Sequence, residues 1–159
     1  MRGDGDGWVF EPDGTRHWGV HGAAGLLLRA PLGDDIIGVL LQHRAVWSHQ
    51  GGTWGLPGGA RDSHESAVDT AIREADEEAG VDETRLRVVA AIVTHRAESG
   101  WTYTTVIAQV DEPVRTTANM ESAELRWVGE DDVALLPLHP GFAASWPDLR
   151  ERLAALDVG

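Results

Sequence analysis

Hydrophobic residues along the chain gather in short, almost continuous runs that are separated by turn-forming residues. Runs of this length between Pro, Gly and Asp are typical of strands that are buried on both faces of a sheet. Two segments, residues 20–30 and 36–44, fit this description, and further strand-like runs predict strands at residues 86–96, 101–110 and 124–128. Because both faces of such a sheet must be shielded from water, the pattern also predicts helices on either side of it.

Helical spacing occurs in a segment that begins near Ser63. Asp62, followed three residues later by Glu65, is similar to a capping box, and Gly80 stands where a left-handed residue would end the helix. The apolar residues in between recur three and four positions apart and predict one narrow buried stripe, made of Val68, Ala71, Ile72, Ala75 and Ala79. Most of the stripe is alanine, so we expect this helix to pack close to its neighbour.

The two ends of the chain complete the predicted architecture. Aromatic runs on both sides of a Pro-Asp-Gly-Thr turn predict a β-hairpin over about residues 8–18. Residues 45–59, rich in glycine and tryptophan, are expected to be loop with a short strand at 54–56. Helical spacing near the end predicts a C-terminal helix, with apolar positions at Phe142, Trp146, Leu149, Leu153 and Leu156. We therefore expect residues 1–159 to form a single domain, an α/β/α sandwich around a mixed β-sheet.

The charge and composition narrow the classes of partner. The chain has 26 acidic residues against 13 Lys plus Arg, a formal net charge of -13, and this balance disfavours binding to long nucleic acid. The sequence has no apolar run of membrane-spanning length, no secretory signal pattern and no cysteine, so we expect a cytoplasmic protein without a membrane partner. A small phosphorylated ligand is compatible with this charge if a divalent cation bridges its phosphates to carboxylates.

The most unusual pattern is a group of acids in the last turns of the predicted long helix. Glu74, Glu77 and Glu78 are neighbours on one helical face, since residues three and four apart lie side by side. Each acid costs about 0.3 to 1 kcal/mol there, because the helix dipole is negative at this end. Two interpretations stay open: a solvated acidic face, or a site for a hard divalent cation such as Mg²⁺, which prefers carboxylate oxygen.

The residues around these acids resemble the Nudix box, the signature of the Nudix hydrolases. Gly59, Glu65, the pair Arg73-Glu74 and the run from Glu77 to Val81 occupy the fixed positions of that pattern at its spacing. The segments HGAAGLLL, VLLQHR, WGLPGG and ELRWV are also similar to the family, so the resemblance covers most of residues 18–140. A composite motif of this length is specific.

The resemblance implies a chemistry and assigns the acids to it. It implies hydrolysis of a nucleoside diphosphate linked to another group, with Mg²⁺ or Mn²⁺, on an α/β/α fold. Glu77 and Glu78 match the family's metal-binding pair, and Glu74 matches a further ligand or the catalytic base. Arg73 matches an arginine that holds these glutamates in place.

Two other parts of the box are expected to play supporting parts. Glu65 matches a glutamate whose role is more often to support the helix, which agrees with its capping position. Gly58 and Gly59 would let the backbone approach the metal and the phosphates, and Gly58 is therefore predicted to be part of the metal site. A plain turn explains the presence of both glycines nearly as well.

Substrate-binding candidates come from outside the box. Aromatic side chains stack on bases and basic side chains neutralise phosphate. This chemistry selects Arg44, Trp47, Trp101 and Tyr103, with His49, His95 and Arg96 as further phosphate-neutralising groups. Two acids just before Arg126, Glu121 and Glu124, are also expected at the substrate site. The alternative for the aromatic residues is packing, and for the charged residues a solvated surface. Glu98, Glu121 and Glu124 are also alternatives to Glu74 as the base.

Markers of the family's subgroups leave the substrate open. The proline of the ADP-ribose branch is absent, and the markers of the diadenosine polyphosphate, coenzyme A and NADH branches are absent or weak. By elimination the resemblance favours a small (d)NTP-like nucleotide, including a damaged one. The alternatives are ADP-ribose, a nucleotide sugar, a dinucleoside polyphosphate, or a module that binds nucleotides without catalysis. The resemblance also makes a homodimer an expectation.

Overall fold

The computed structural model describes residues 3–44, 52–117 and 122–158. The strands in chain order are β1 (Trp8–Phe10), β2 (Arg16–Trp18), β3 (Ala23–Gly33), β4 (Ile36–Arg44), β5 (Trp54–Gly55), β6 (Gly58–Ala60), β7 (Arg87–Arg96), β8 (Thr102–Gln109) and β9 (Ser122–Gly129). The α-helices are α1 (Ala67–Ala79) and α2 (Pro140–Val158), and two short 3-10 helices are η1 (Glu83–Arg85) and η2 (Glu130–Leu135).

The long strand β3 organises the seven-stranded sheet. Along one side it pairs antiparallel with β6 near its beginning and with β4 near its end, and along the other it pairs parallel with β8. β8 continues to β7, and β4 continues to β5 and β9, all antiparallel. One parallel pair among antiparallel pairs makes the sheet mixed, as the sequence predicts.

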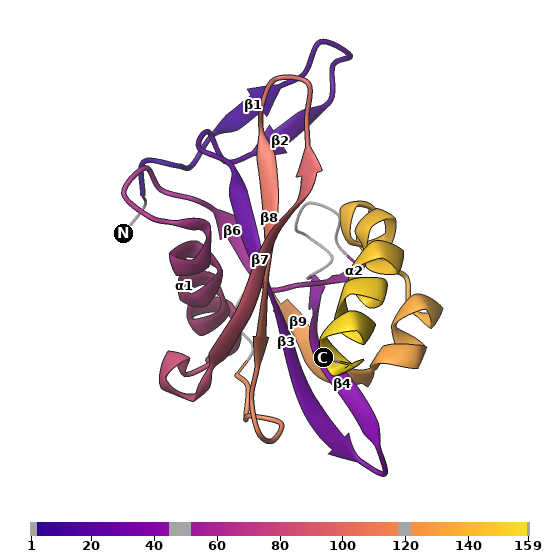
Figure 1. Ribbon diagram of the computed structural model, residues 1–159. Coiled ribbons are helices and arrows are strands. Elements are labelled where there is room, and N and C mark those ends of the chain that lie inside the picture. Colours follow the sequence, from indigo (N-terminus) through magenta and orange to yellow (C-terminus); the bar gives the residue numbers. More distant parts are fainter. Residues whose placement is uncertain (1–2, 45–51, 118–121, 159) are drawn as a thin grey trace.

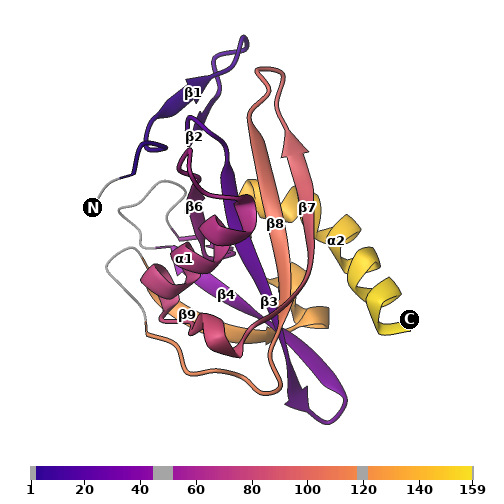
Figure 2. The same ribbon diagram turned by 60° about the vertical axis from the view of Figure 1, so that its left-hand side comes forward.

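The two helices cover opposite faces of this sheet (Figure 1; Figure 2). Alternate residues of β3 point to opposite faces, so Leu26 packs in the core under α1 and Leu27 in the core under α2. The α1 core contains the buried alanines of the predicted stripe, Ala71, Ala75 and Ala79. The expected α/β/α sandwich is confirmed. Within the described residues, no helix combines the length and apolarity that crossing a membrane requires.

Strand boundaries follow the apolar runs with some shifts. β4 covers the predicted 36–44, whereas β3 begins at Ala23 instead of residue 20 and continues to Gly33. The turn between them is therefore short, and its Asp34 and Asp35 both have positive φ, 52° and 62°, as the tight hairpin turn requires. The expected loop at 45–59 is also corrected where it is described, because Gly58 and Gly59 pair with β3 as part of β6.

The predicted start of the long helix near Ser63 is wrong. α1 begins at Ala67, and its capping box joins Ser66 and Asp69: the Asp69 amide donates to Ser66 Oγ (3.0 Å) and the Ser66 amide to Asp69 Oδ2 (3.2 Å). Asp62 and Glu65 instead close a separate turn upstream, in which the Asp62 amide donates to Glu65 Oε1 (3.1 Å). The predicted end is confirmed, since Gly80 is left-handed with φ 69°.

At the C-terminal helix the predicted apolar positions are buried, except one. Phe142, Trp146, Leu149 and Leu153 join the core under α2, whereas Leu156 is 41% exposed. Leu156 lies in the last turn of α2.

Where the sequence predicts an N-terminal hairpin, β1 pairs with β2 antiparallel. The hairpin docks on the turn that joins β7 and β8. Glu11 accepts hydrogen bonds from the amide (3.0 Å) and the hydroxyl (2.6 Å) of Ser99. The His17 ring stacks on Trp101 with ring centroids 4.2 Å apart. The hairpin is therefore part of the folded structure and lies at one end of the sheet (Figure 2).

Candidate active site

The acids of α1 lie against the backbone of β6. The Gly58 amide donates to Glu78 Oε2 (2.8 Å), and Glu78 is only 4% exposed. A Cβ atom at Gly59 would come within 2.6 Å of the Glu74 carboxyl carbon. Glycine is therefore needed at residue 59, because any larger side chain would displace Glu74. The close approach seen here is that of the Glu74 and Glu78 carboxylates to β6, and the expected approach of a metal and phosphates to these glycines stays a prediction.

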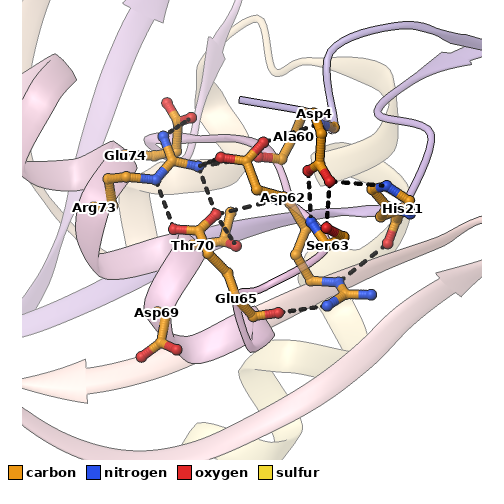
Figure 3. A network of polar contacts seen from close by, with 12 residues as sticks. Asp4, His21, Ala60, Asp62, Ser63, Glu65, Asp69, Thr70, Arg73 and Glu74 are labelled. Carbon is orange, nitrogen blue, oxygen red and sulfur yellow. Dashed lines mark hydrogen bonds and ion pairs between the residues drawn. The ribbon is translucent and has the colours of Figure 1, made fainter. Parts of the chain in front are cut away.

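Arg73 connects acids of the site, and Figure 3 shows its contacts with Glu65 and Glu74. Its Nη1 donates to Glu74 Oε1 (2.9 Å) and to Glu77 Oε2 (3.4 Å). Its Nε and Nη2 donate to the two oxygens of Glu65 at 2.7 and 2.8 Å, a bidentate pair. A further bond from Nη2 to the Ala60 carbonyl (3.2 Å) ties the guanidinium to β6. These contacts fit the holding role that the resemblance implies for Arg73.

The pKa of Glu65 is strongly lowered. The hydrogen bond from Arg73 is the main cause that lowers the pKa of Glu65 to about 2, and it outweighs the effect of burial. The Asp62 amide and the Thr70 hydroxyl donate to the same carboxylate. The pKa of Arg73 is raised in return, mainly by the hydrogen bond to Glu65. Both groups therefore stay charged at neutral pH, which agrees with a supporting part for Glu65.

The other three acids offer oxygen ligands of the kind that Mg²⁺ and Mn²⁺ prefer. Glu74 and Glu78 are held close to β6, whereas the Glu77 side chain is 57% exposed and is contacted by Arg73. Three carboxylates on neighbouring positions of one helix form a hard oxygen donor set, and a divalent cation fits the chemistry of that set. The fit rests on the carboxylate oxygens of Glu74 and Glu78, which lie beside the glycine backbone of β6.

A second group of ligand-type atoms lies just upstream. One atom each from Asp62, His64 and Glu65 falls within 4.8 Å of the others. Glu65 is already bound bidentately by Arg73, and Asp62 Oδ2 lies 3.8 Å from Arg73 Nη2. Asp62 and Glu65 therefore lie around the Arg73 guanidinium.

Gly25 of β3, which was not among the predicted site residues, makes room for Tyr103, a predicted substrate residue. A Cβ at Gly25 would overlap the hydroxyl of Tyr103, so the tyrosine lies across β3 only because residue 25 has no side chain. Burial, followed by the charge of Glu78, raises the pKa of Tyr103, and the charge of Arg44 opposes this shift. Tyr103 is thus neutral at physiological pH. A glycine within an apolar strand signals such a close approach.

The remaining predicted substrate residues lie in several places. Trp101 stacks on His17 of the N-terminal hairpin. This contact agrees with the alternative that Trp101 is a packing residue and does not stack on a base. Glu124 pairs with Arg126 (3.1 Å), whose guanidinium lies 5.0 Å from the centre of the Trp54 ring. Glu98 lies in the exposed turn between β7 and β8. Three predicted residues, Trp47, His49 and Glu121, lie outside the described part of the chain.

Comparison with known proteins gives a family match. A family model described as "NUDIX domain" matches residues 19–149. A protein of Mycobacterium tuberculosis with the name "Putative 8-oxo-dGTP diphosphatase 3" is 62% identical over 162 residues, which cover 99% of this chain and 75% of that protein. A "Nucleoside triphosphate pyrophosphatase/Nudix hydrolase fusion protein" of Bifidobacterium longum is 42% identical, and the match covers 96% of this chain and 32% of that protein.

Solved structures show the same fold. The crystal structure of the Nudix hydrolase RenU from M. smegmatis superposes with a TM-score of 0.91 at 61% identity, covering 95% of this chain and 96% of that one. A C. elegans Ap4A hydrolase superposes with a TM-score of 0.68 at 22% identity, covering 84% of this chain and 98% of that one. The second match supports the fold alone.

Proposed function

Because the chain belongs to the Nudix family, we propose that it is a Mg²⁺- or Mn²⁺-dependent pyrophosphohydrolase of a nucleoside triphosphate, with an oxidised guanine nucleotide as the preferred substrate. Membership of the family and the class of enzyme, a hydrolase of phosphoanhydride bonds, agree with the expectations from the sequence. The cation and the substrate are the parts that we propose.

The single observation that carries this proposal is the arrangement of Glu74, Glu77 and Glu78 beside the glycines of β6. Glu78 is tied to the Gly58 amide, and Arg73 contacts both Glu74 and Glu77. A carboxylate group near the negative end of a helix is unfavourable unless cations compensate it. This cost is explained if the three acids hold a metal ion that binds the phosphates of the substrate.

In the mechanism that we propose, Glu74, Glu77 and Glu78 would hold the cation. When bound, the cation supplies Lewis acidity, which makes water more acidic and neutralises charge on the phosphate oxygens. Arg73 keeps Glu74 and Glu77 in place through Nη1. A carboxylate of the site accepts the proton of the attacking water, and we assign this step to Glu74. Glu98 and Glu124 are the described alternatives, and Glu124 is engaged with Arg126.

The choice of an oxidised guanine nucleotide rests on the relative from M. tuberculosis. That protein is 62% identical over nearly the whole of this chain, and its name refers to 8-oxo-dGTP. The elimination of other subgroups from the sequence favours the same class. ADP-ribose, dinucleoside polyphosphates and nucleotide sugars are the competing substrates. The cytoplasmic location and the homodimer expected from the sequence stay predictions.

A substrate panel with a charge-matched pair of variants tests the proposal. We expect pyrophosphate release from 8-oxo-dGTP with a higher kcat/KM than from dGTP, Ap4A, ADP-ribose or a nucleotide sugar, and loss of release when the divalent cation is removed by chelation. Glu77→Gln is expected to lower kcat about 100-fold or more, since a metal ligand contributes several kcal/mol to the transition state. Asp76→Asn, which removes one charge from an exposed neighbour on α1, is the control and is expected to keep its activity.

Two results would contradict the proposal. Full turnover by Glu77→Gln, with circular dichroism equal to that of the wild type, would remove Glu77 from the site. Preferred cleavage of Ap4A or ADP-ribose would replace the proposed substrate while leaving the hydrolase class unchanged.

A further inference from the structure

The described N-terminal segment, Gly3 to Gly7, lies against the loop that leads into α1 (Figure 3). The Gly5 amide donates to Asp62 Oδ1 (2.9 Å) in a buried hydrogen bond. The Asp4 carboxylate accepts from the Ser63 amide (2.8 Å) and from the Ser63 hydroxyl. These bonds join residues that are 57 and 59 positions apart in the sequence. The loop therefore depends on a distant segment for part of its order.

The same segment is fixed on its other side by the chain after β2. The Gly19 amide donates to the Gly7 carbonyl (2.7 Å), and the Val20 amide donates to the Gly5 carbonyl (2.8 Å). His21 Nε2 lies 3.9 Å from Asp4 Oδ2. The segment is thus held between two parts of the molecule, the loop before α1 and the chain after β2.

Glycine is required for this close packing. A Cβ at Gly5 would overlap the Arg61 carbonyl oxygen, which is backbone and has no freedom to move aside. A Cβ at Gly3 would overlap the Asp62 carboxylate. The alternation of glycine and aspartate in this segment therefore has a physical reason: the glycines permit contact and Asp4 makes it.

The loop connects this segment to the active-site arginine. Asp62 Oδ1 accepts a hydrogen bond from the Gly5 amide, and Asp62 Oδ2 lies 3.8 Å from Arg73 Nη2. The Asp62 amide donates to Glu65, and Glu65 binds Arg73 bidentately. Arg73 in turn contacts Glu74 and Glu77. An unbroken chain of polar contacts leads from the N-terminal segment to the proposed cation ligands.

We propose that residues 3–7 brace the active site, with Asp4 and Asp62 as positioning residues that keep Arg73, and through it the acids of α1, in the geometry that binds the cation. This inference rests on the proposed function for the identity of the acids as ligands. Neither aspartate is assigned contact with the substrate. Their effect passes through Glu65 and Arg73, because catalysis depends steeply on the placement of the reacting groups.

Three variants and a matched control test the brace. Gly5→Ala pushes the segment away from Arg61, and Asp4→Ala removes the bonds to Ser63. Asp4→Asn is the conservative variant, because its amide can accept from the Ser63 backbone and donate to the hydroxyl. Asp6→Ala is the control, since Asp6 is an exposed acid of the same segment. The readouts are amide hydrogen exchange at residues 61–65, the Mn²⁺ dissociation constant without substrate, and kcat and KM.

We expect faster exchange at 61–65 in Gly5→Ala and Asp4→Ala. Because small displacements of positioned groups are costly, we also expect a dissociation constant for Mn²⁺ raised about five-fold and kcat lowered about ten-fold, with KM changed by less than about two-fold. Asp4→Asn and Asp6→Ala are expected to behave as the wild type. A thermal unfolding midpoint for each variant separates this local effect from general unfolding.

The brace is overturned if exchange at 61–65 does not change in Gly5→Ala and Asp4→Ala, or if it rises while Mn²⁺ affinity stays that of the wild type. It is also overturned if Asp6→Ala weakens Mn²⁺ binding as much as Asp4→Ala, because that result would indicate a general charge effect. A wild type that binds Mn²⁺ but cleaves no nucleotide would refute the proposed function alone, and the exchange rates and Mn²⁺ affinities would still decide the brace.

Discussion

At the scale of single residues, the contacts of Arg73 decide the character of the site. A guanidinium has a fixed fork of donors, and here the fork is shared between Glu65 on one side and the acids of α1 on the other. Glu65 receives the two short, parallel bonds, so it fixes the direction of the guanidinium. The remaining nitrogen then restrains Glu74 and Glu77. A lysine has no such fork and is not equivalent here.

The pair between Glu65 and Arg73 predicts a defined loss of stability in acid. The pKa of Glu65 falls from the usual 4.5 to about 2 on folding. The ion pair therefore contributes fully above pH 4.5, and its contribution is lost as the pH falls from 4.5 towards 2, because the unfolded chain takes up its proton first. The shift corresponds to about 3 kcal/mol. Glu65→Gln is expected to lower the free energy of unfolding by about this amount at pH 7, and by about half of it at pH 3.

Urea unfolding at the two pH values measures both differences. Glu151→Gln, which changes an exposed acid on α2, is the control and is expected to stay within about 0.5 kcal/mol of the wild type at both. An equal loss for Glu65→Gln at pH 7 and pH 3 would contradict the assignment of the pH dependence to this pair.

At the scale of elements, sequence periodicity predicted the helices and strands with regular apolar spacing well. It predicted the start of α1 and the short strand β6 poorly. The stripe of α1 is spaced by the helix itself, so Ala71, Ala75 and Ala79 were predictable. The true start of the helix was not, because two acid-containing turns follow one another and only the tertiary contacts of Glu65 decide which one caps it. β6 was missed because glycine has no strand propensity. It pairs because β3 offers a free edge beside Ala23–Gly25.

Close packing of α1 against the sheet predicts that a buried alanine will not accept a larger side chain. Ala75 is 0% exposed in the core between α1 and the sheet, and Ala75→Leu is expected to destabilise the protein by about 2 kcal/mol through overpacking. Asp76→Leu makes a large apolar substitution at the next, exposed position and is expected to cost less than about 0.5 kcal/mol. Chemical denaturation compares them. Equal costs would mean that α1 is packed loosely.

At the scale of the whole molecule, the site is assembled from segments that the sequence cannot place together. The fixed spacing of the Nudix box made Arg73 and the acids of α1 recognisable, because they belong to one continuous stretch. The contact of Gly5 with Asp62 and the position of Tyr103 over Gly25 join distant segments. Only the fold of β3, with β6 on one edge and β8 on the other, brings them together.

A buried ion pair ties the sheet to the segment that leads into α2. Arg29 of β3 is 2% exposed, and its Nε and Nη2 donate to Glu130 Oε1 at 3.0 and 2.7 Å. Glu130→Ala removes both of these hydrogen bonds and the opposite charge beside the buried guanidinium, so it is expected to cost about 3 kcal/mol. The double variant Arg29→Met/Glu130→Ala is expected to be more stable than Glu130→Ala alone, because it also removes the buried charge of Arg29.

The exposed pair of Arg152 and Asp148 on α2 (3.0 Å) provides the comparison, since its side chains are 52% and 63% exposed. Asp148→Ala is expected to cost less than about 1 kcal/mol, because water already solvates both charges. Urea unfolding at neutral pH measures all three variants. A double variant less stable than Glu130→Ala would show that Arg29 stabilises the junction through its packing and its other contacts more than its charge destabilises it. We expect the cost of losing each ion pair to follow its burial and not the distance between its charges. The two pairs have similar N–O distances and differ in their access to solvent.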